Sequence, residues 1–171
     1  MAYNNKVFTG ADGVMVLSRE EGSAADEVLD EYEIEQVGRV KGIELYAHQD
    51  IRRFYSIGTN LPTEMRTGNI KIWGKIKRAY INGALLRLLL GKYALAGENP
   101  SSPIDAPAFD INIQLKTPDI PTDGPDHLSR ITINHVILDN WSFAVPEDDF
   151  VLEEVTFQAL RILAHDEQLP E

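Results

Sequence analysis

The stretch NIKIWGKIKRAY, from Asn69 to Tyr80, alternates apolar and basic side chains along its length. Three of its even positions carry isoleucine and three of its odd positions carry lysine, namely Ile70, Ile72 and Ile76 against Lys71, Lys75 and Lys77. Alternation with a period of two is typical of a β-strand that has one face in an apolar core and the other outside it. The stretch therefore predicts a half-buried strand whose outer face is cationic.

The same periodicity recurs elsewhere and makes β-structure the dominant prediction. Five further segments are expected to be extended: Arg39–His48, Ile51–Ile57, Phe109–Lys116, Arg130–Ile137 and Glu154–Ala159. In the fourth of these segments, the pattern places Ile137 on the same core-facing side as Ile131 and Ile133.

One helix is predicted between these strands, over Ala84–Leu90. Asn82 precedes it as a good N-cap, and Gly91 follows it as a residue that can end a helix in a left-handed conformation. Because most of its positions are leucine, this short helix is expected to be largely buried. We expect Leu86 and Leu89, three residues apart on one face, to lie under a sheet.

A second, acidic segment, Ala24–Asp30, is a further helical candidate. Turn residues mark three connections: Gly58–Gly68, which is long for a hairpin, Glu98–Pro107 and Thr117–Asp126. The predicted fold is mainly β, a sandwich or barrel-forming set of antiparallel sheets with one packed α-helix near 83–91. We expect a single domain over residues 1–171, in which segment 1–29 has the fewest assignable elements.

Composition excludes several classes of protein. The chain has 171 residues, of which 43% are hydrophobic and 25% are charged, as in ordinary globular proteins. It has no cysteine, which excludes disulfide frameworks, thiolate metal sites and cysteine nucleophiles. The N-terminus lacks the apolar run of a secretory signal, and the longest apolar run, Ala84–Leu90, is far too short to span a bilayer. We therefore expect a soluble protein made in the cytoplasm, without stable membrane association.

Charge is distributed unevenly along the chain. Residues 1–35 carry a net charge of −7, residues 36–92 carry +8 and residues 93–171 carry −12. A basic middle between acidic ends can make one copy electrostatically complementary to the next, or it can offer a basic track to a polyanion. Because the whole chain has a net charge of −11, the sequence argues against a dedicated polyanion binder.

The sequence lacks the motifs of common catalytic and metal sites. Its histidines, His48, His127, His135 and His165, do not have the close spacing of zinc motifs, and His135 falls in an apolar strand that favours a core or interface role. Glu147–Asp149 lacks the glycine and distal glutamate of an EF-hand and is expected to be a turn. Neither a Gly-x-Ser-x-Gly elbow nor a phosphate-binding loop is present. We therefore expect no metal, no cofactor and no enzymatic activity.

The order of the predicted strands, loop and helix along the chain is distinctive. The chain has, in turn, the strand Val37–Tyr46, the segment Arg52–Gly58, the long loop, the strand Gly68–Ile76, the leucine-rich helix, the strand Phe109–Ile113 and the C-terminal Val155–Ile162. This succession resembles the tail tube proteins of tailed bacteriophages and related contractile injection systems. The resemblance extends from about Glu31 to His165, and the N-terminal residues 1–29 match it least.

The resemblance implies a structural virion protein without chemistry of its own. Members of this family have a β-sandwich with a flanking helix, and they assemble as six-membered rings that stack into a tube. Their sheets meet edge to edge around a lumen through which DNA and ejected proteins pass. The implied partners are further copies of the chain, the tape measure, tail initiator or baseplate and terminator proteins, and a sheath if the tail contracts. The implied location is the virion tail, assembled in the host cytoplasm.

Two sets of candidate contact residues follow. In the family, the long loop reaches the neighbouring ring, which here corresponds to Gly58–Gly68 with Leu61, Glu64, Met65 and Arg66. A loop with both apolar and charged residues is better explained by a partner than by folding alone. The second set is the basic strand, a proposed subunit interface with Arg52, Lys71, Lys75 and Lys77. For this strand, with Trp73, Arg78 and Tyr80, a solvated face and a nucleic-acid track remain open alternatives.

Two other functions compete with self-assembly. The first is a monomeric β-sandwich binding module for a carbohydrate or peptide, of the kind that also contains one helix. The second is a hydrolytic enzyme on a β scaffold, which the missing motifs disfavour. Oligomer size discriminates the first from a tube subunit, because a module stays small whereas a tube subunit forms rings or polymers.

Overall fold

The computed structural model describes residues 8, 10, 13–19, 25–31, 40–80, 82–91, 107–116 and 127–168. Within them the chain forms six strands and two helices. In chain order these are β1 (Gly13–Arg19), α1 (Ala25–Glu31), β2 (Val40–Phe54), β3 (Glu64–Ala79), α2 (Ala84–Leu90), β4 (Phe109–Lys116), β5 (His127–Ala144) and β6 (Leu152–Gln168).

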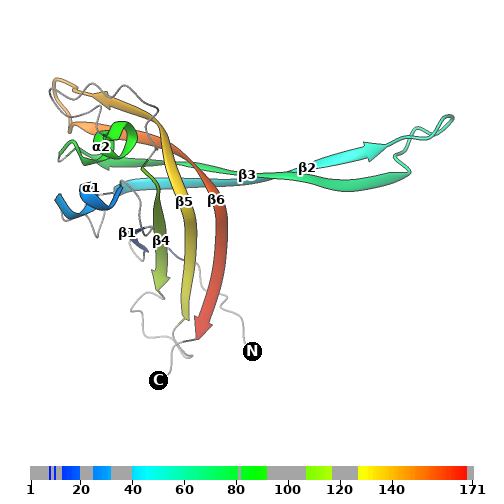
Figure 1. Ribbon diagram of the computed structural model, residues 1–171, viewed down its shortest axis with the longest axis horizontal. Helices are drawn as coiled ribbons and strands as arrows, with labels where there is room; N and C mark the ends of the chain where they lie inside the picture. The colour runs from blue at the N-terminus through cyan, green and yellow to red at the C-terminus, as the bar shows by residue number, and fades with distance from the viewer. Residues whose placement is uncertain are drawn as a thin grey trace.

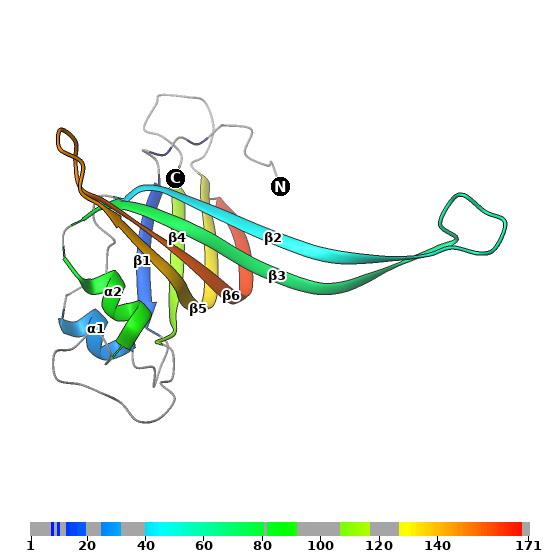
Figure 2. The ribbon, with the colours of Figure 1, turned by 90° about the horizontal axis from the view of Figure 1, so that it is seen from above.

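The strands form one antiparallel sheet in the order β1-β4-β5-β6-β3-β2. This sheet is strongly bent: β2 and β3 run across the molecule, while β4 and the far parts of β5 and β6 turn away from them (Figures 1 and 2). β5 and β6 are long enough to belong to both parts. The first half of β6 pairs with β3, and β5 pairs with β4 along the part that begins near His127. The prediction of a mainly β protein with antiparallel strands is confirmed.

Helices α1 and α2 lie together on one side of the sheet, where they close the apolar core (Figure 2). Apart from Pro107, the largest fully buried apolar side chains come from α2 and four strands: Ile76, Leu85, Leu88, Phe109, Ile111, Ile133, Val136, Val155 and Phe157. Each such side chain stabilises the fold by roughly 1.5–3 kcal/mol relative to an exposed one. The core therefore depends on contacts between elements that are far apart in the sequence.

Both predicted helices form. α2 occupies the expected residues and ends at Gly91, whose φ of 56° lies in the left-handed region that favours glycine. Gly83 directly precedes the helix, so Asn82 acts from one position further back, and its Oδ1 accepts a hydrogen bond from the Ala84 N–H at 3.3 Å. α1 lies one residue later than the candidate Ala24–Asp30 at each end.

The buried stripe of α2 differs from the prediction. Leu85 and Leu88 are fully buried, whereas Leu86 and Leu89 are only half-buried. Both pairs have the same spacing, so periodicity alone does not distinguish them in a helix that is leucine almost all round. Which pair of leucines is buried depends on the side of the helix that β5 and α1 contact.

The connection between β2 and β3 differs from the prediction at both ends: β3 begins earlier than expected, and β2 ends at Phe54, before the expected Ile57. The predicted segments Arg39–His48 and Ile51–Ile57 are replaced by one continuous strand, β2, over Val40–Phe54, with a register shift against β3 between Gln49 and Ile51. The prediction of Ile51–Ile57 is wrong after Phe54, because Tyr55–Ile57 lie beyond the end of the strand. Strand β3 begins at Glu64 rather than after Gly68. The prediction of Gly58–Gly68 as a loop is therefore wrong at its C-terminal end, because backbone pairing with β2 continues through Thr67 to Glu64.

A bulge in β5 reverses the predicted alternation. His135 has a φ of 53°, and the register against β4 shifts at this point. The Asp110 carboxylate holds the bulge, because its two oxygens accept hydrogen bonds from the His135 N–H at 2.9 Å and the Asn134 side-chain amide at 2.8 Å. Val136 is consequently buried in place of Ile137, which corrects the expected core position of that isoleucine.

The N-terminal region contributes a strand that sequence analysis did not predict. β1 pairs with β4 at the edge of the sheet, Gly13 opposite Leu115 and Arg19 opposite Phe109. Its apolar run is too short for a clear period. The predicted connections Glu98–Pro107, apart from Pro107, and Thr117–Asp126 lie outside the described residues.

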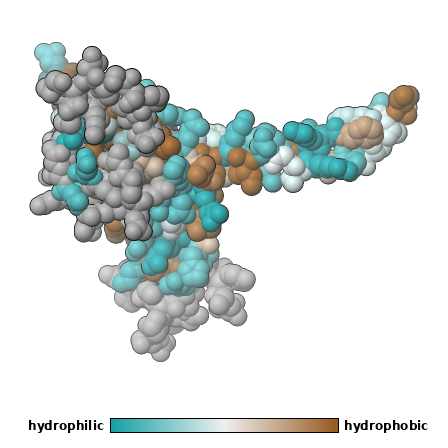
Figure 3. Space-filling model, in the orientation of Figure 1, coloured by the Kyte–Doolittle hydropathy of each residue, from teal (hydrophilic) through white to brown (hydrophobic). Residues whose placement is uncertain are grey.

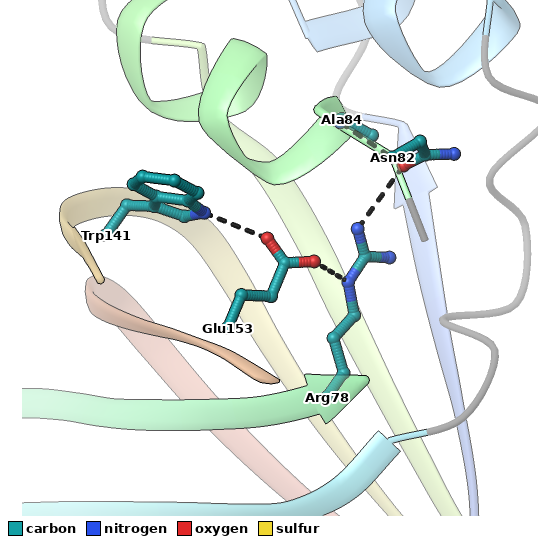
Figure 4. A network of polar contacts seen from close by, with 5 residues as sticks. All are labelled: Arg78, Asn82, Ala84, Trp141 and Glu153. Carbon is teal, nitrogen blue, oxygen red and sulfur yellow. Dashed lines mark hydrogen bonds and ion pairs between the residues drawn. The ribbon is translucent and has the colours of Figure 1, made fainter. Parts of the chain in front are cut away.

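A buried ion pair joins three strands and the segment that precedes α2, next to the core (Figure 4). Arg78, at the end of β3, donates from Nε to Oε1 of Glu153 on β6 at 2.5 Å, and both side chains are almost fully buried. Oε2 of Glu153 accepts the Trp141 indole N–H from β5 at 2.9 Å. Arg78 also donates from Nη2 to Oδ1 of Asn82, at 3.4 Å, next to the start of α2. Arg78 is therefore not part of a basic surface track, which corrects the sequence-based grouping.

Gly74 allows β2, β3 and β6 to approach closely. A Cβ atom at this position would lie 2.4 Å from the Glu44 carbonyl oxygen and 2.6 Å from Cζ of Phe157. Phe157 is the cross-strand neighbour of Gly74, and its fully buried ring covers the glycine. The position therefore requires a residue without a side chain.

Gly74→Ala is expected to destabilise the protein by about 1–3 kcal/mol, because the added methyl group overlaps backbone and a fully buried ring. Gly42→Ala is the matched control, since a Cβ there meets nothing within 4 Å. Its effect should stay within about 0.5 kcal/mol. Urea denaturation monitored by tryptophan fluorescence measures both values, and equal effects would contradict the close approach at Gly74.

Glu153→Gln is expected to cost about 3–5 kcal/mol, because it leaves the buried Arg78 charge without a counterion. Glu154→Gln removes the neighbouring carboxylate, which faces Lys77 at the surface, and should cost less than about 1 kcal/mol. The double variant Arg78→Met/Glu153→Leu should be less destabilised than Glu153→Gln. The same denaturation experiment measures all three, and similar losses for the two glutamine variants would refute the assignment.

Candidate assembly surfaces

The hairpin of β2 and β3 projects from the body of the molecule (Figures 1 and 2). This projection, residues 47–71, is the arm. β3 is paired on both sides as far as Ile72, which lies opposite Ala159 of β6; farther out, among the described residues, it pairs with β2 alone. At the tip, the Thr63 N–H donates to the Phe54 carbonyl at 2.9 Å. A two-stranded ribbon of this kind is marginally stable in water unless something packs against it.

The arm exposes many large apolar side chains. More than half of the surface of each is accessible: Ile51, Phe54, Tyr55, Ile57, Leu61, Met65 and Ile70. Figure 3 shows apolar surface at the tip of the arm and along its length. Ile70 was predicted to face the core, but it lies just beyond the point where β6 leaves β3 and is 64% exposed. Apolar surface on this scale is typical of a protein contact.

The charged side chains of the arm are incompletely balanced within the described part of the chain. Arg66 contacts Glu64, Nε to Oε1, at 2.6 Å, and His48 contacts Asp50 at 3.2 Å. Arg52 lies directly opposite Arg66 in the hairpin. Like charges directly opposite each other in an antiparallel pair are destabilising. This pairing favours an acidic partner from outside the arm.

The predicted basic strand is largely neutralised by its neighbours. Nζ of Lys75 lies 3.3 Å from Oε2 of Glu44 on β2, and Nζ of Lys77 lies 3.1 Å from Oε2 of Glu154 on β6. Lys71 is exposed at the base of the arm, so the structure does not gather Arg52, Lys71, Lys75 and Lys77 into one cationic cluster. The two paired lysines form cross-strand ion pairs, which contribute little to stability at exposed positions.

A groove of about 790 Å³ lies where β3 and β6 diverge. Tyr46 and Trp73 stack at its side, with ring centroids 5.6 Å apart. The Tyr46 hydroxyl donates to Oε2 of Glu44 at 2.6 Å. This hydrogen bond, aided by Lys75, lowers the pKa of Glu44, and the same bond raises the pKa of Tyr46. Asp139 completes the groove and accepts hydrogen bonds from Thr156 and Gln158.

The opposite end of the molecule carries a second exposed apolar group, here named the aromatic end. It comprises the exposed side chains of Tyr80 and Phe143, the half-buried Trp141 beside them, and the turn 145–151 between β5 and β6. Phe143 contacts Tyr80 edge to face, with ring centroids 4.7 Å apart, and stacks on Trp141 at 5.4 Å. Val145 and Phe150 are 68% and 81% exposed. As predicted, Glu147–Asp149 lies in a turn, and its three carboxylates are exposed.

Sequence analysis found only part of these surfaces. Leu61, Met65, Glu64 and Arg66 all lie on the arm, as expected from the long loop. Phe54, Tyr55 and Ile57 at the tip, and Val145 and Phe150 at the aromatic end, were not singled out. Their signal was available, since large apolar residues beside turn residues are unusual without a partner.

Two negative findings apply to the residues that the structure describes. None of their helices is long and apolar enough to cross a membrane. No group of three or more histidine, aspartate or glutamate side chains among them is placed to hold a metal ion. In this part of the chain, Asp139 is the carboxylate of the groove, and it is engaged by two side-chain donors.

Comparison with solved structures identifies the fold. A sheath/tube terminator of the extracellular contractile injection system PVC matches with a TM-score of 0.59 and 12% identity, over 96% of this chain and 99% of that chain. The SPP1 tail tube matches with a TM-score of 0.58 and 8% identity, over 95% and 81%. A chain of the six-fold symmetrised baseplate of the anti-feeding prophage matches with a TM-score of 0.56 and 10% identity, over 96% and 97%.

The chain therefore has the fold of phage and contractile injection system tail tube and terminator proteins, and the resemblance predicted from its sequence is confirmed at this level. No protein-family model matches the sequence, and no curated protein matches it either. With identities this low, the likeness is one of fold, and the function has to be argued from the surfaces.

Proposed function

We propose that this protein is a structural subunit of a tail-like tube, and that six copies form a ring that stacks on further rings. The observation that carries the proposal is the arm, which exposes apolar side chains far from the core. A chain with this arm has a large surface that only a partner can cover. The fold shared with the SPP1 tail tube supports a partner that is another copy of the chain.

The sheet also favours ring formation. β1 and β2 are its two end strands, and their outer edges have no strand partner among the described residues. Open edges invite pairing with another chain, and closure into a ring removes them. The six-fold symmetrised baseplate, which contains a chain of this fold, supports six subunits as the number.

The proposed role is mechanical and electrostatic. The stacked rings form a conduit through which DNA passes during ejection, in a virion tail that is assembled in the host cytoplasm. The further partners are the tape measure protein, tail initiator or baseplate and terminator proteins, and a sheath where the tail contracts. A strongly acidic chain suits a conduit, because an acidic wall repels phosphates instead of retaining them. The subunit needs no catalytic activity for this role.

A monomeric binding module remains the competing function, and the groove is the observation that favours it. The stacked pair of Tyr46 and Trp73, with polar side chains nearby, offers an aromatic face to a sugar ring or peptide. This function leaves the apolar arm without a purpose. A module of this kind would stay monomeric and would bind its ligand through the groove.

Purified protein at high concentration is expected to form rings or hollow tubes with sixfold symmetry. Negative-stain electron microscopy and analytical ultracentrifugation measure this directly. Hollow tubes assign the chain to the body of a tube, and single rings that never stack assign it to a terminator-like role. A strict monomer at all concentrations, even beside tail initiator components, would contradict the proposal and favour the module.

Replacing the two most exposed apolar residues of the arm tip, Ile57→Ser/Leu61→Ser, is expected to block ring stacking and leave the subunit folded. Neither side chain contributes to the core, so the free energy of unfolding should change by less than about 0.5 kcal/mol. The control Ile57→Leu/Leu61→Ile keeps the apolar surface and should assemble normally. Normal tubes from the serine variant would remove the tip from the stacking interface.

A further inference from the structure

The arm and the aromatic end lie at opposite ends of the molecule's long axis (Figures 1 and 2). They are therefore too far apart to meet within one copy. Two different exposed surfaces at opposite ends of identical molecules can make a heterologous contact, in which each copy uses one end on one neighbour and the other end on the next.

The two ends are complementary in chemistry. The arm carries Arg52, Arg53 and Arg66 among its apolar side chains, and each of its two acids already has a partner: Asp50 contacts His48 and Glu64 contacts Arg66. The aromatic end carries three successive exposed carboxylates at Glu147–Asp149, and none of them forms an ion pair with another described residue. Guanidinium groups bind carboxylates and also stack on aromatic rings, so both features of this end suit the arginines of the arm.

Apolar surface is present on both sides of the proposed contact. Phe54, Ile57 and Leu61 are exposed at the arm tip, and Val145 and Phe150 are exposed in the turn. An interface with apolar anchors and a rim of opposite charges is the usual composition of a specific protein contact. Arg52, which lies opposite Arg66 and forms no ion pair with another described residue, would also receive an acidic partner.

We propose that the arm of one copy docks on the aromatic end of a second copy, with Arg52, Arg53 and Arg66 facing Glu147–Asp149 and Phe150. This inference rests on the proposed function and deepens it by naming the surface that receives the arm. The contact is directional, so it propagates from copy to copy and sets the order of the assembly.

Cross-linking tests the contact without disturbing the charges. The chain has no cysteine, so two singly substituted proteins, Leu61→Cys and Phe150→Cys, can be mixed and treated with a short bismaleimide. A covalent dimer that requires both proteins is expected under assembly conditions. The control pairs Leu61→Cys with Lys116→Cys, an exposed position at the end of β4, and should give none. Assembled rings or tubes with no Leu61–Phe150 product, or with an equal control product, overturn the inference and leave the proposed function standing.

A charge swap tests the chemistry. Arg52→Glu/Arg53→Glu is expected to raise the protein concentration needed for assembly at least about tenfold, because like charges then face each other. Adding Glu147→Lys/Asp148→Lys to the same chain should restore most of the loss, whereas Lys116→Glu alone should have little effect. Loss of assembly without rescue overturns the inference. A wild-type protein that never assembles in the same buffers overturns both the inference and the proposed function.

Discussion

The buried pair of Arg78 and Glu153 is the interaction on which the arrangement of the body depends. Removing two charges from water is expensive unless each finds a partner and their remaining hydrogen-bonding groups are satisfied. Here the partners come from β3, β6 and β5, with Asn82 beside the start of α2 (Figure 4). These elements must meet in one geometry, because any other leaves a buried charge uncompensated. The pair therefore favours one register between β3 and β6 over all slipped alternatives.

That register determines where the arm begins. β3 and β6 pair from Ala79 opposite Leu152 to Ile72 opposite Ala159, and then they diverge. Inside the paired region Ile72 and Ile76 are buried, while Ile70, two residues farther out, is exposed. One strand thus supplies core residues at one end and a projecting surface at the other. In this chain the residues that stabilise the subunit are therefore separate from the exposed residues on which the proposed assembly rests.

Local patterns predicted most of the elements correctly. Strand Phe109–Lys116 was placed at its observed bounds, and the helix at 84–90 with its terminal Gly91 was also correct. Each depends on properties of neighbouring residues, namely side-chain alternation, helix propensity and the freedom of glycine at positive φ. Of the candidate contact residues, the four predicted in the long loop lie on the projecting arm, where a contact with a partner is possible. Phe150 and Val145 were missed, because their signal is the presence of apolar residues beside turn residues, which a search for strand or helix periodicity does not detect.

The sequence by itself determined that this chain is built from amphipathic strands with one leucine-rich helix, because those features depend on residues that are close together in the sequence. Only the tertiary structure decided which side of each pattern is buried. Arg78 is buried and Ile70 is exposed. At the His135 bulge Val136 is buried instead of Ile137, and in α2 Leu85 is buried instead of Leu86. These outcomes depend on which distant strand or helix lies alongside, and so on the long-range pairing of β3, β5 and β6, for which no local pattern carries information.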